Sequence, residues 1–506
     1  MENIMRRLNE LLDSAFGGVL RLFERLPTFA FIALVFAGSY LSFSPNPNED
    51  HYLQFSKQFM NPDWVPNSQI LTEFPGTRLL YQCIMGSLLQ VFSFDLLVFA
   101  MRLLMILVFS LILSKLYKRL NFSNLQVAFH LVVLYLGCQS LFAGAWMFVS
   151  VEPKGIAYIF VLLSILQLLN DRLLPAVLLM IVATYFHILV GFFTFIYLWA
   201  TLFFFHKSQK VSIKTLFLWA GLFLLAAAPL VLYLKTSIAP PDSGLQPRPD
   251  WIYTYFRAPH HTALATSMRY FYREHFYGVL LSGFGLILAI RLLRQQQPKD
   301  LLFLNQFVVL SLAGAIALVS VAFIDKEGVL LKYYLYRIMA LSTFFLTLLI
   351  AKWLWHFIRN DAHKLLNELV LLLSILFFLK LLLPNLLTNK EYFFDSADFN
   401  SACQFIRDHT SQDALVFTFV EDVSITRRTE RDRFVVYKFI PAKLDRIHDW
   451  YDRILEKEKV LEDTQYLDTL VQKYQLTHIL TDHQTPLPAP YSVQFENKKY
   501  KVYAVN

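Results

Sequence analysis

Long apolar runs recur along most of this 506-residue chain and limit what it can fold into. Hydrophobic residues make up 56% of the sequence and charged residues only 17%, whereas soluble domains are about a quarter charged. Several of these runs, rich in Leu and Phe, approach the about 20 apolar residues that an α-helix needs to cross a bilayer. The pattern therefore predicts a mainly α polytopic membrane protein, built as a helix bundle.

We expect a membrane domain over residues 28–388, with about eleven spans. The spans are 28–45, 96–114, 124–142, 155–170, 174–187, 190–205, 213–234, 276–293, 301–323, 333–352 and 364–385. A long first external loop, 46–95, contains an apolar stretch with no basic anchor behind it, which we interpret as a helix lying in the membrane interface.

Basic residues set the expected orientation. Lys and Arg cluster in KLYKR at 115–119, in RLLRQQQPK at 291–299 and in the first 27 residues, all on one side of the predicted spans. The positive-inside rule makes that side cytoplasmic, and it explains the net charge of +8 more simply than binding to nucleic acid does. Residues 1–27 alternate charged and apolar groups without a cleavage site, which favours an interfacial amphipathic helix.

The C-terminal segment, 389–506, has a different character. Between 391 and 506 it carries 19 acidic and 15 basic residues, against 38 and 46 in the whole chain. Helical patterns alternate with strand-like runs such as ALVFTF and RFVVYKF, which predicts a small external α/β domain. It contains no Gly-rich phosphate loop or other recognisable catalytic motif. The three cysteines of the chain show no disulfide or metal-ligand spacing.

Glu49, Asp50 and His51, in SPNPNEDHY, follow the first predicted span and are the leading candidates for chemistry. Carboxylates at the edge of the hydrocarbon are costly and often functional. Burial would raise the pKa of a carboxyl group there and suit it to act as a base near neutral pH. The competing interpretation is a capping or solvated group at the end of a helix.

A second set of candidates lies in the other external segments. Arg257, His260 and His261 share the stretch YFRAPHHTAL, where Arg and His would bind phosphate oxygens; a metal site is less favoured, and a plain polar loop is the alternative. Arg337 could pair with a substrate phosphate or extend to lipid headgroups. Three further charged residues have a structural explanation in the sequence. Glu152 and Lys154 flank Pro153 and suit a local ion pair, and Arg102, inside a span, needs a carboxylate partner.

The order of these features resembles the GT-C class of membrane glycosyltransferases. Members have many spans, a long first external loop with an interfacial helix, and an acidic motif after the first span, here Glu49-Asp50. The tail pattern and YFRAPHHTAL also resemble a group of uncharacterised bacterial multi-spanning proteins. The resemblance implies transfer of a sugar from a polyprenyl phosphate to an acceptor hydroxyl, with Asp50 or Glu49 as catalytic carboxylate. Phosphate or substrate contacts would fall to His51, Arg257, His260, His261, Arg337, Glu152 and Lys154.

The sequence departs from the GT-C pattern in some features, and two other functions are compatible with it. A second acidic motif is not clear, the acceptor motif of oligosaccharyltransferases is absent, and a divalent metal is correspondingly not favoured as a cofactor. The alternatives are a transporter or flippase of a lipid-linked or anionic substrate, and a non-catalytic membrane assembly protein. The expected partners are a lipid-linked sugar donor and membrane lipids. The expected location is a bacterial inner membrane, with a cytoplasmic N-terminus and a periplasmic C-terminal domain.

Overall fold

The computed structural model of the chain describes most of residues 18–505. The residues outside the description within that range are 19–20, 69–70, 73–77, 137–138, 149, 238–243, 245, 359–369, 381–395, 442 and 488–489. Most of the predicted amphipathic helix at 1–27 therefore lies outside the described residues, although 21–25 are helical.

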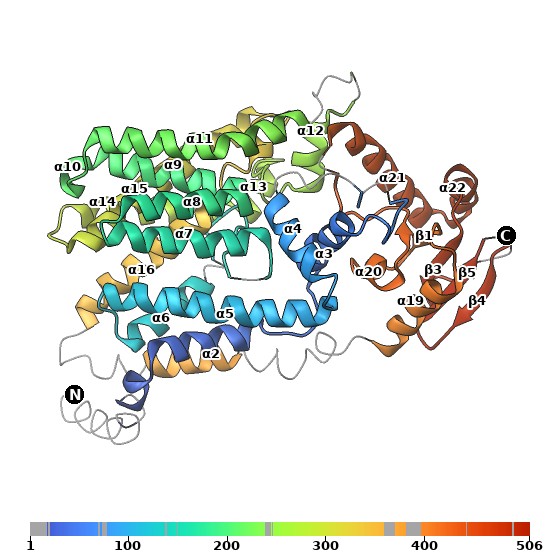
Figure 1. Cartoon of the computed structure of the whole chain (residues 1–506), viewed down its shortest axis with the longest axis horizontal. Helices are drawn as coiled ribbons and strands as arrows, with labels where there is room; N and C mark the ends of the chain where they lie inside the picture. The colour runs from blue at the N-terminus through green and yellow to red at the C-terminus, as the bar shows by residue number, and fades with distance from the viewer. Residues whose placement is uncertain are drawn as a thin grey trace.

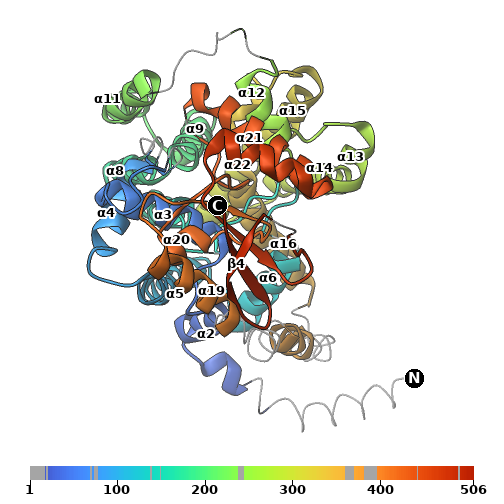
Figure 2. The same cartoon turned by 90° about the vertical axis from the view of Figure 1, so that its right-hand side faces the viewer.

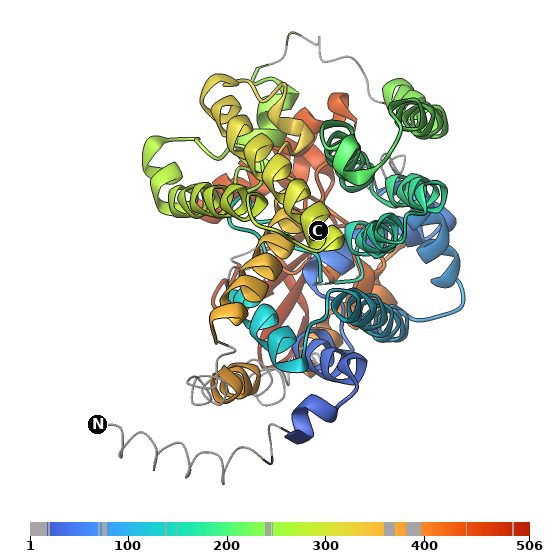
Figure 3. The same cartoon turned by 90° about the vertical axis from the view of Figure 1, so that its left-hand side faces the viewer.

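Apolar helices that run side by side form the larger part of the molecule (Figure 1). They are α2 (Thr28–Tyr40), α5 (Phe94–Arg119), α6 (Asn124–Leu136), α7 (Pro153–Leu169), α8 (Leu173–Phe186), α9 (Ile188–Phe204), α11 (Ile213–Ser237), α14 (Phe276–Leu293), α15 (Lys299–Ile324) and α16 (Met339–Ile358), with the short α10 (His206–Gln209) after α9. Many of them are seen end-on in Figure 3. A helix satisfies its own backbone hydrogen bonds, which is what a segment inside lipid must do.

Four of these helices, α5, α11, α14 and α15, are long and apolar enough to cross a membrane. Each of the other predicted spans coincides with a shorter apolar helix of 10–17 residues, including Val370–Lys380 within the predicted span 364–385. The chain is thus an integral membrane protein with a mainly helical fold. The number of eleven crossings stays a prediction.

The segment that follows α2 forms two packed helices, α3 (Pro47–Met60) and α4 (Leu79–Leu88). They approach closely because α4 has Gly86 at the contact, where a Cβ would lie 2.2 Å from the carbonyl oxygen of Ser56. Tyr81 on α4 donates a hydrogen bond to the carbonyl of Val151, 2.8 Å away, just before α7. These contacts fix the start of α3 against the ends of the membrane helices.

The predicted span at 333–352 starts later than its sequence indicates. Residues Leu331–Tyr333 form the short 3₁₀ helix η3, and Tyr334 has a left-handed backbone with φ of 52°. α16 begins only at Met339, so Arg337 precedes it. The reason is a tertiary contact: Lys332 pairs with the buried Asp250 at 2.9 Å, which ties this segment to α12 (Pro249–Trp251).

Asp250 belongs to the segment between α11 and α14, which contacts the C-terminal domain through α21 (Leu444–Glu462). The segment contains α12 (Pro249–Trp251), which continues as the π-helix η2 (Ile252–Arg257), and then α13 (Met268–Glu274). A π-helix is rare and occurs often at functional sites. It ends here at Arg257, and the HH pair follows in a turn.

The C-terminal domain is α/β, as the sequence predicts. Its elements are α19 (Ala397–His409), β1 (Leu415–Thr418), α20 (Ile425–Thr429), β2 (Asp432–Arg433), α21 (Leu444–Glu462), η5 (Thr464–Tyr466), α22 (Leu467–Tyr474), β3 (His478–Asp482), β4 (Ser492–Glu496) and β5 (Tyr500–Ala504). The sheet has the order β2-β1-β3-β5-β4, with β2, β1 and β3 parallel and the closing β4–β5 hairpin antiparallel. Figure 2 views the molecule from the side of this domain.

The predicted strand RFVVYKF is wrong beyond its first residue. β2 covers only Asp432–Arg433, and residues 434–440 are irregular. Their apolar character has another cause: Phe434 packs in the core of the C-terminal domain, whereas Val436 and Phe439 are buried in the core of the membrane domain. The segment 434–440 is therefore a wedge between the two domains, apolar on both sides.

Candidate active site at the junction of the two domains

The acidic pair lies in the first turn of α3, not in a loop. Asn46 caps the helix: its side chain accepts hydrogen bonds from the backbone N–H groups of Asn48 and Glu49, at 2.9 and 3.1 Å. Glu49 in turn accepts from the backbone N–H of Asn46 at 2.8 Å, and Pro47 occupies the first helical position. This capping box and the positive end of the helix dipole both stabilise negative charge there.

Glu49 faces the membrane domain and is completely buried. Arg102 of α5 binds both carboxylate oxygens, with Nε 2.9 Å from Oε1. The backbone N–H of Val151 donates to the same oxygen at 2.8 Å. The expectation that Arg102 would have a carboxylate partner is thus confirmed, and the partner is one of the two candidate catalytic acids.

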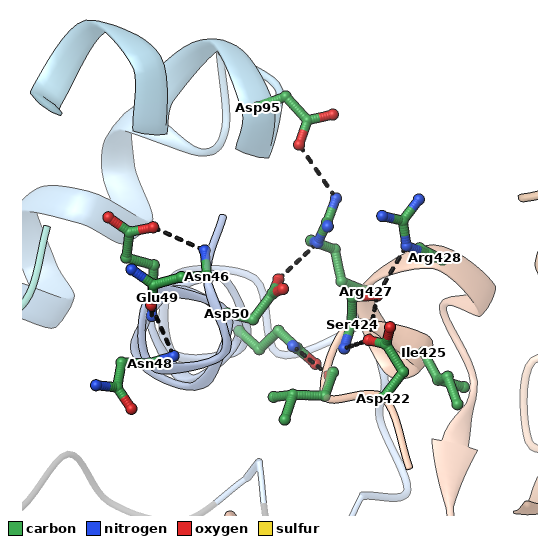
Figure 4. A network of polar contacts seen from close by, with 12 residues as sticks. Asn46, Asn48, Glu49, Asp50, Asp95, Asp422, Ser424, Ile425, Arg427 and Arg428 are labelled. Atoms are coloured by element: carbon green, nitrogen blue, oxygen red, sulfur yellow. Dashed lines mark hydrogen bonds and ion pairs between the residues drawn. The ribbon is translucent and has the colours of Figure 1, made fainter. Parts of the chain in front are cut away.

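Asp50 faces the C-terminal domain, on a different side of α3 (Figure 4). Its Oδ1 accepts a hydrogen bond of 2.6 Å from Nε of Arg427 on α20, and both side chains are almost fully buried. Arg427 also reaches Asp95 at the start of α5, at 3.4 Å. Burial raises the pKa of the Asp50 carboxyl group to about 6, although Arg427 acts in the opposite direction. At neutral pH Asp50 is ionised and close to its pKa, which suits a general base.

The contact between α3 and the C-terminal domain extends along one helix face. Asp50, Gln54 and Lys57 are spaced by four and three residues, so they project from the same side of α3. Gln54 Nε2 donates to the carbonyl of Val423 at 3.0 Å, and Lys57 pairs with Glu430 at 3.3 Å. α20 and the residues on either side of it thus place Arg427 against Asp50.

Basic side chains surround the space next to the first turn of α3. Five of them form what we call the cationic ring: Arg78, Lys154, Arg257, Arg337 and Lys438. The first part of the ring is joined by contacts around His51. Arg78 Nη1 lies 3.2 Å from Nε2 of His51. The imidazole of His51 contacts the phenyl group of Phe439, with centroids 5.2 Å apart. Lys438, next to Phe439 in the chain, accepts a hydrogen bond of 3.2 Å from Arg257 at its backbone carbonyl.

The second part of the ring lies nearer the membrane helices. Arg337 sits over the face of Tyr334 at 4.7 Å, and Lys154 over that of Trp146 at 3.7 Å. His261 joins the two, since its ring contacts both of these aromatic rings. Lys154 lies within electrostatic range of Arg337 and of Lys438, so the two parts of the ring lie close to one another.

Glu152 connects the ring to α3. It pairs with Lys154 at 3.1 Å, which confirms the predicted local ion pair, and accepts a hydrogen bond of 3.0 Å from Asn48. Lys438 lies within electrostatic range of both Glu152 and Asp50. The candidate base and the cationic ring are therefore parts of one site.

The histidines of the site are kept neutral. Burial lowers the pKa of His51 well below its usual value, and the charges of Arg78, Arg257 and Lys438 lower it further. Burial and the neighbouring His260 lower the pKa of His261 to about 2, and its Nδ1 lies 3.1 Å from the carbonyl of Ala143. These rings can donate or accept a hydrogen bond without adding to the positive charge.

An apolar groove lies beside Glu49. It is a shallow groove with a cavity volume of about 20 Å³, and it runs between α2, α5, Phe148 and Ser150. The lining residues are Phe36, Tyr40, Arg102, Met105, Ile106, Phe109, Phe148 and Ser150. Its polar end is formed by Arg102 and Ser150, which bond Glu49 and Glu152 respectively.

The structure brings most of the sequence candidates together and adds others. Asp50, His51, Glu152, Lys154, Arg257, His260, His261 and Arg337 border one space, whereas Glu49 turns away into its pair with Arg102. Sequence reasoning missed Arg78, Arg427 and Lys438. Arg78 had a usable signal, because it is a cation in an external apolar stretch. Within the described residues, no three His, Cys, Asp or Glu side chains gather as a metal site would require.

Comparisons with known proteins give little beyond this geometry. Residues 397–457, from α19 into α21, match a family described as a domain of unknown function (DUF6798). No curated protein matches the chain. Among solved structures, the chain is similar to ArnT from Cupriavidus metallidurans, solved bound to undecaprenyl phosphate. The two share 12% identity over 97% of this chain and 98% of that one, with a TM-score of 0.47.

Proposed function

We propose that this protein is a membrane glycosyltransferase of the GT-C type. It would move a sugar from a polyprenyl-phosphate donor to an acceptor hydroxyl at the external face. The observation that carries the proposal is that a buried carboxylate, Asp50, lies close to the cationic ring, within electrostatic range of its member Lys438.

The chemistry assigns a role to each part. Asp50 takes the proton of the acceptor hydroxyl as its oxygen attacks the anomeric carbon, and the bond from that carbon to the phosphate oxygen breaks. Because Arg427 binds Oδ1, we assign proton transfer to Oδ2. The leaving prenyl phosphate gains negative charge, which the cationic ring stabilises. Glu49 holds α3 in place through Arg102, and we give it a positioning role.

Buried polar atoms without partners support a polar ligand at the ring. Among the described residues, His51 Nδ1, Arg257 Nε and Arg337 Nε are buried and make no hydrogen bond. Buried donors are normally satisfied, so each unsatisfied one calls for an explanation. Phosphate oxygens would accept hydrogen bonds from these groups, and the apolar surface of the groove beside Glu49 would contact part of the prenyl chain.

The test is a transfer assay on the full chain in lipid nanodiscs. Purified protein is incubated with radiolabelled prenyl-phosphate sugars and a membrane extract as acceptor source, and labelled product is measured. We expect Asp50→Asn to reduce transfer by about 10²–10⁴-fold, the usual contribution of a general base. The matched control is Asp95→Asn, which removes the other carboxylate on Arg427 and should leave transfer within a few fold of wild type. Full activity of the Asp50→Asn variant would overturn the assignment.

A further inference from the structure

The cationic ring has more positive charge than its carboxylates neutralise. Lys154 is balanced by Glu152. The other four members, Arg78, Arg257, Arg337 and Lys438, have no ion-pair partner in the part of the chain that the structure describes. Asp50 does not balance them, since it is paired with Arg427.

The four unbalanced charges are not dispersed on the surface. Arg257 and Lys438 both act on His51 and on His260, so they border the same small volume. Arg78 and Arg337 both lie within electrostatic range of the half-buried Tyr52. All four side chains are only half-buried, and like charges held this close together repel one another unless a counter-charge is present. An anion bound among these four cations would therefore stabilise the site.

A single phosphodiester supplies too little charge for this site. A sugar linked to a prenyl monophosphate has one ionised phosphate oxygen and so one negative charge. Even the released monophosphate carries only about −1.5 to −2 at pH 7. Two phosphate groups match four unpaired cations better.

The ring also has two places for such groups. Arg257, Lys438, Arg78 and His51 are joined by contacts at the wedge between the domains. Arg337, Lys154 and His261 are joined through Tyr334 and Trp146 next to the membrane helices. Each place has a buried guanidinium Nε without a partner, on Arg257 and on Arg337 respectively.

We propose that the cationic ring holds two phosphate groups at once, one at the domain wedge and one beside Arg337. The proposal rests on the proposed function and narrows its substrate class. The two groups can come from one prenyl diphosphate, or from a prenyl monophosphate donor together with a phosphorylated acceptor.

The experiment measures lipid binding and does not depend on transfer. Full-length protein in uncharged nanodiscs is titrated with undecaprenyl phosphate and with undecaprenyl diphosphate, and tryptophan fluorescence reports binding. A third arm repeats the monophosphate titration with millimolar inorganic phosphate. If one ligand supplies both groups, we expect the diphosphate to bind at least about tenfold more tightly. If two ligands supply them, inorganic phosphate should strengthen monophosphate binding instead of competing with it.

Variants at each end of the ring sharpen the result. Lys438→Gln and Arg337→Gln should each remove most of the diphosphate preference, and both effects should weaken as salt is added, because the contacts are charged. Lys57→Gln, on α3 but outside the ring, should change neither affinity. Size-exclusion profiles and thermal melts establish that the variants are folded.

The outcomes separate the two proposals. Equal affinity for both lipids, together with competition by inorganic phosphate, would overturn the two-phosphate site while leaving a prenyl-phosphate enzyme intact. Absence of binding to either lipid by folded protein would overturn both.

Discussion

Glu49 and Asp50 are neighbours in the chain, each is bound by an arginine, and their surroundings differ. Glu49 faces the membrane domain, where Arg102 and the Val151 N–H satisfy it. Asp50 faces the C-terminal domain, where Arg427 binds Oδ1. The first carboxylate is locked into one domain, and the second is held across a junction between two. Both residues are carboxylic acids, so their chemical type does not distinguish their roles. The element that pairs with each one does.

The largest effect should follow from breaking the pair inside the membrane domain. Glu49→Gln leaves the Arg102 guanidinium buried without its counter-charge, and loss of one partner of a buried ion pair costs about 3–5 kcal/mol. We expect a lower yield of folded protein and a much lower melting temperature in nanodiscs. Asp50→Asn, measured beside it, should show a smaller loss, because Arg427 keeps Asp95 as a second carboxylate at 3.4 Å. If the Glu49→Gln variant melts like wild type, the two carboxylates do not differ as the structure indicates.

Replacing Asp50 should cost the fold less stability at higher pH, because burial disfavours the ionised form of this carboxyl group. Its pKa in the folded protein is about 6, above the 3.8 of an exposed carboxyl group. A raised pKa gives stability that is present below 3.8 and is lost as pH rises through 6, by up to about 3 kcal/mol for two pKa units. Asp50→Asn cannot titrate, so its melting temperature relative to wild type should rise between pH 5 and pH 8. A pH-independent difference would show that burial does not dominate at Asp50.

The sequence predicted one of these two pairings in part. An arginine inside an apolar run needs a carboxylate, and Arg102 has one, but nothing in the spacing identifies Glu49, 53 residues earlier, as that partner. The Glu152–Lys154 pair was predictable because it is local. Arg427 was not, because its role depends on how the C-terminal domain docks on α3.

The fold shows the same division between local and tertiary information. Helices and most strands of the C-terminal domain follow from periodicity, whereas RFVVYKF was misassigned because apolar residues also occur where two domains bury a loop. Lys438 lies within this apolar run, and nothing in the sequence of the run indicates that it would belong to a ligand-binding site. The candidates at 49–51, 257–261 and 337 were found as separate loops, and only the three-dimensional structure places them around one space.

A smaller and more specific effect is expected from Arg427, through the pH dependence of transfer. Its charge lowers the pKa of Asp50, so Arg427→Gln should move the acid limb of the pH–rate profile above the wild-type value of about 6. Arg428→Gln is the graded comparison: Arg428 bonds Ser424 and Asn400 within its own domain, and its charge lowers the pKa of Asp50 less than that of Arg427, so its removal should move the acid limb in the same direction by a smaller amount. A fall in rate at every pH with an unmoved acid limb would make Arg427 a structural residue only.

The smallest effect should come from the outer end of the same junction. Lys57 and Glu430 pair at 3.3 Å, but their side chains are 19% and 37% exposed, so water screens them. Exposed pairs contribute about 0.2–1 kcal/mol, and a double-mutant cycle of Lys57→Gln and Glu430→Gln should find a coupling in that range. A larger coupling would mean that this pair, and not Asp50–Arg427, holds the C-terminal domain on α3. In that case Arg427 would be free to leave Asp50 while the domain stays docked, and the junction would need no opening to expose the base.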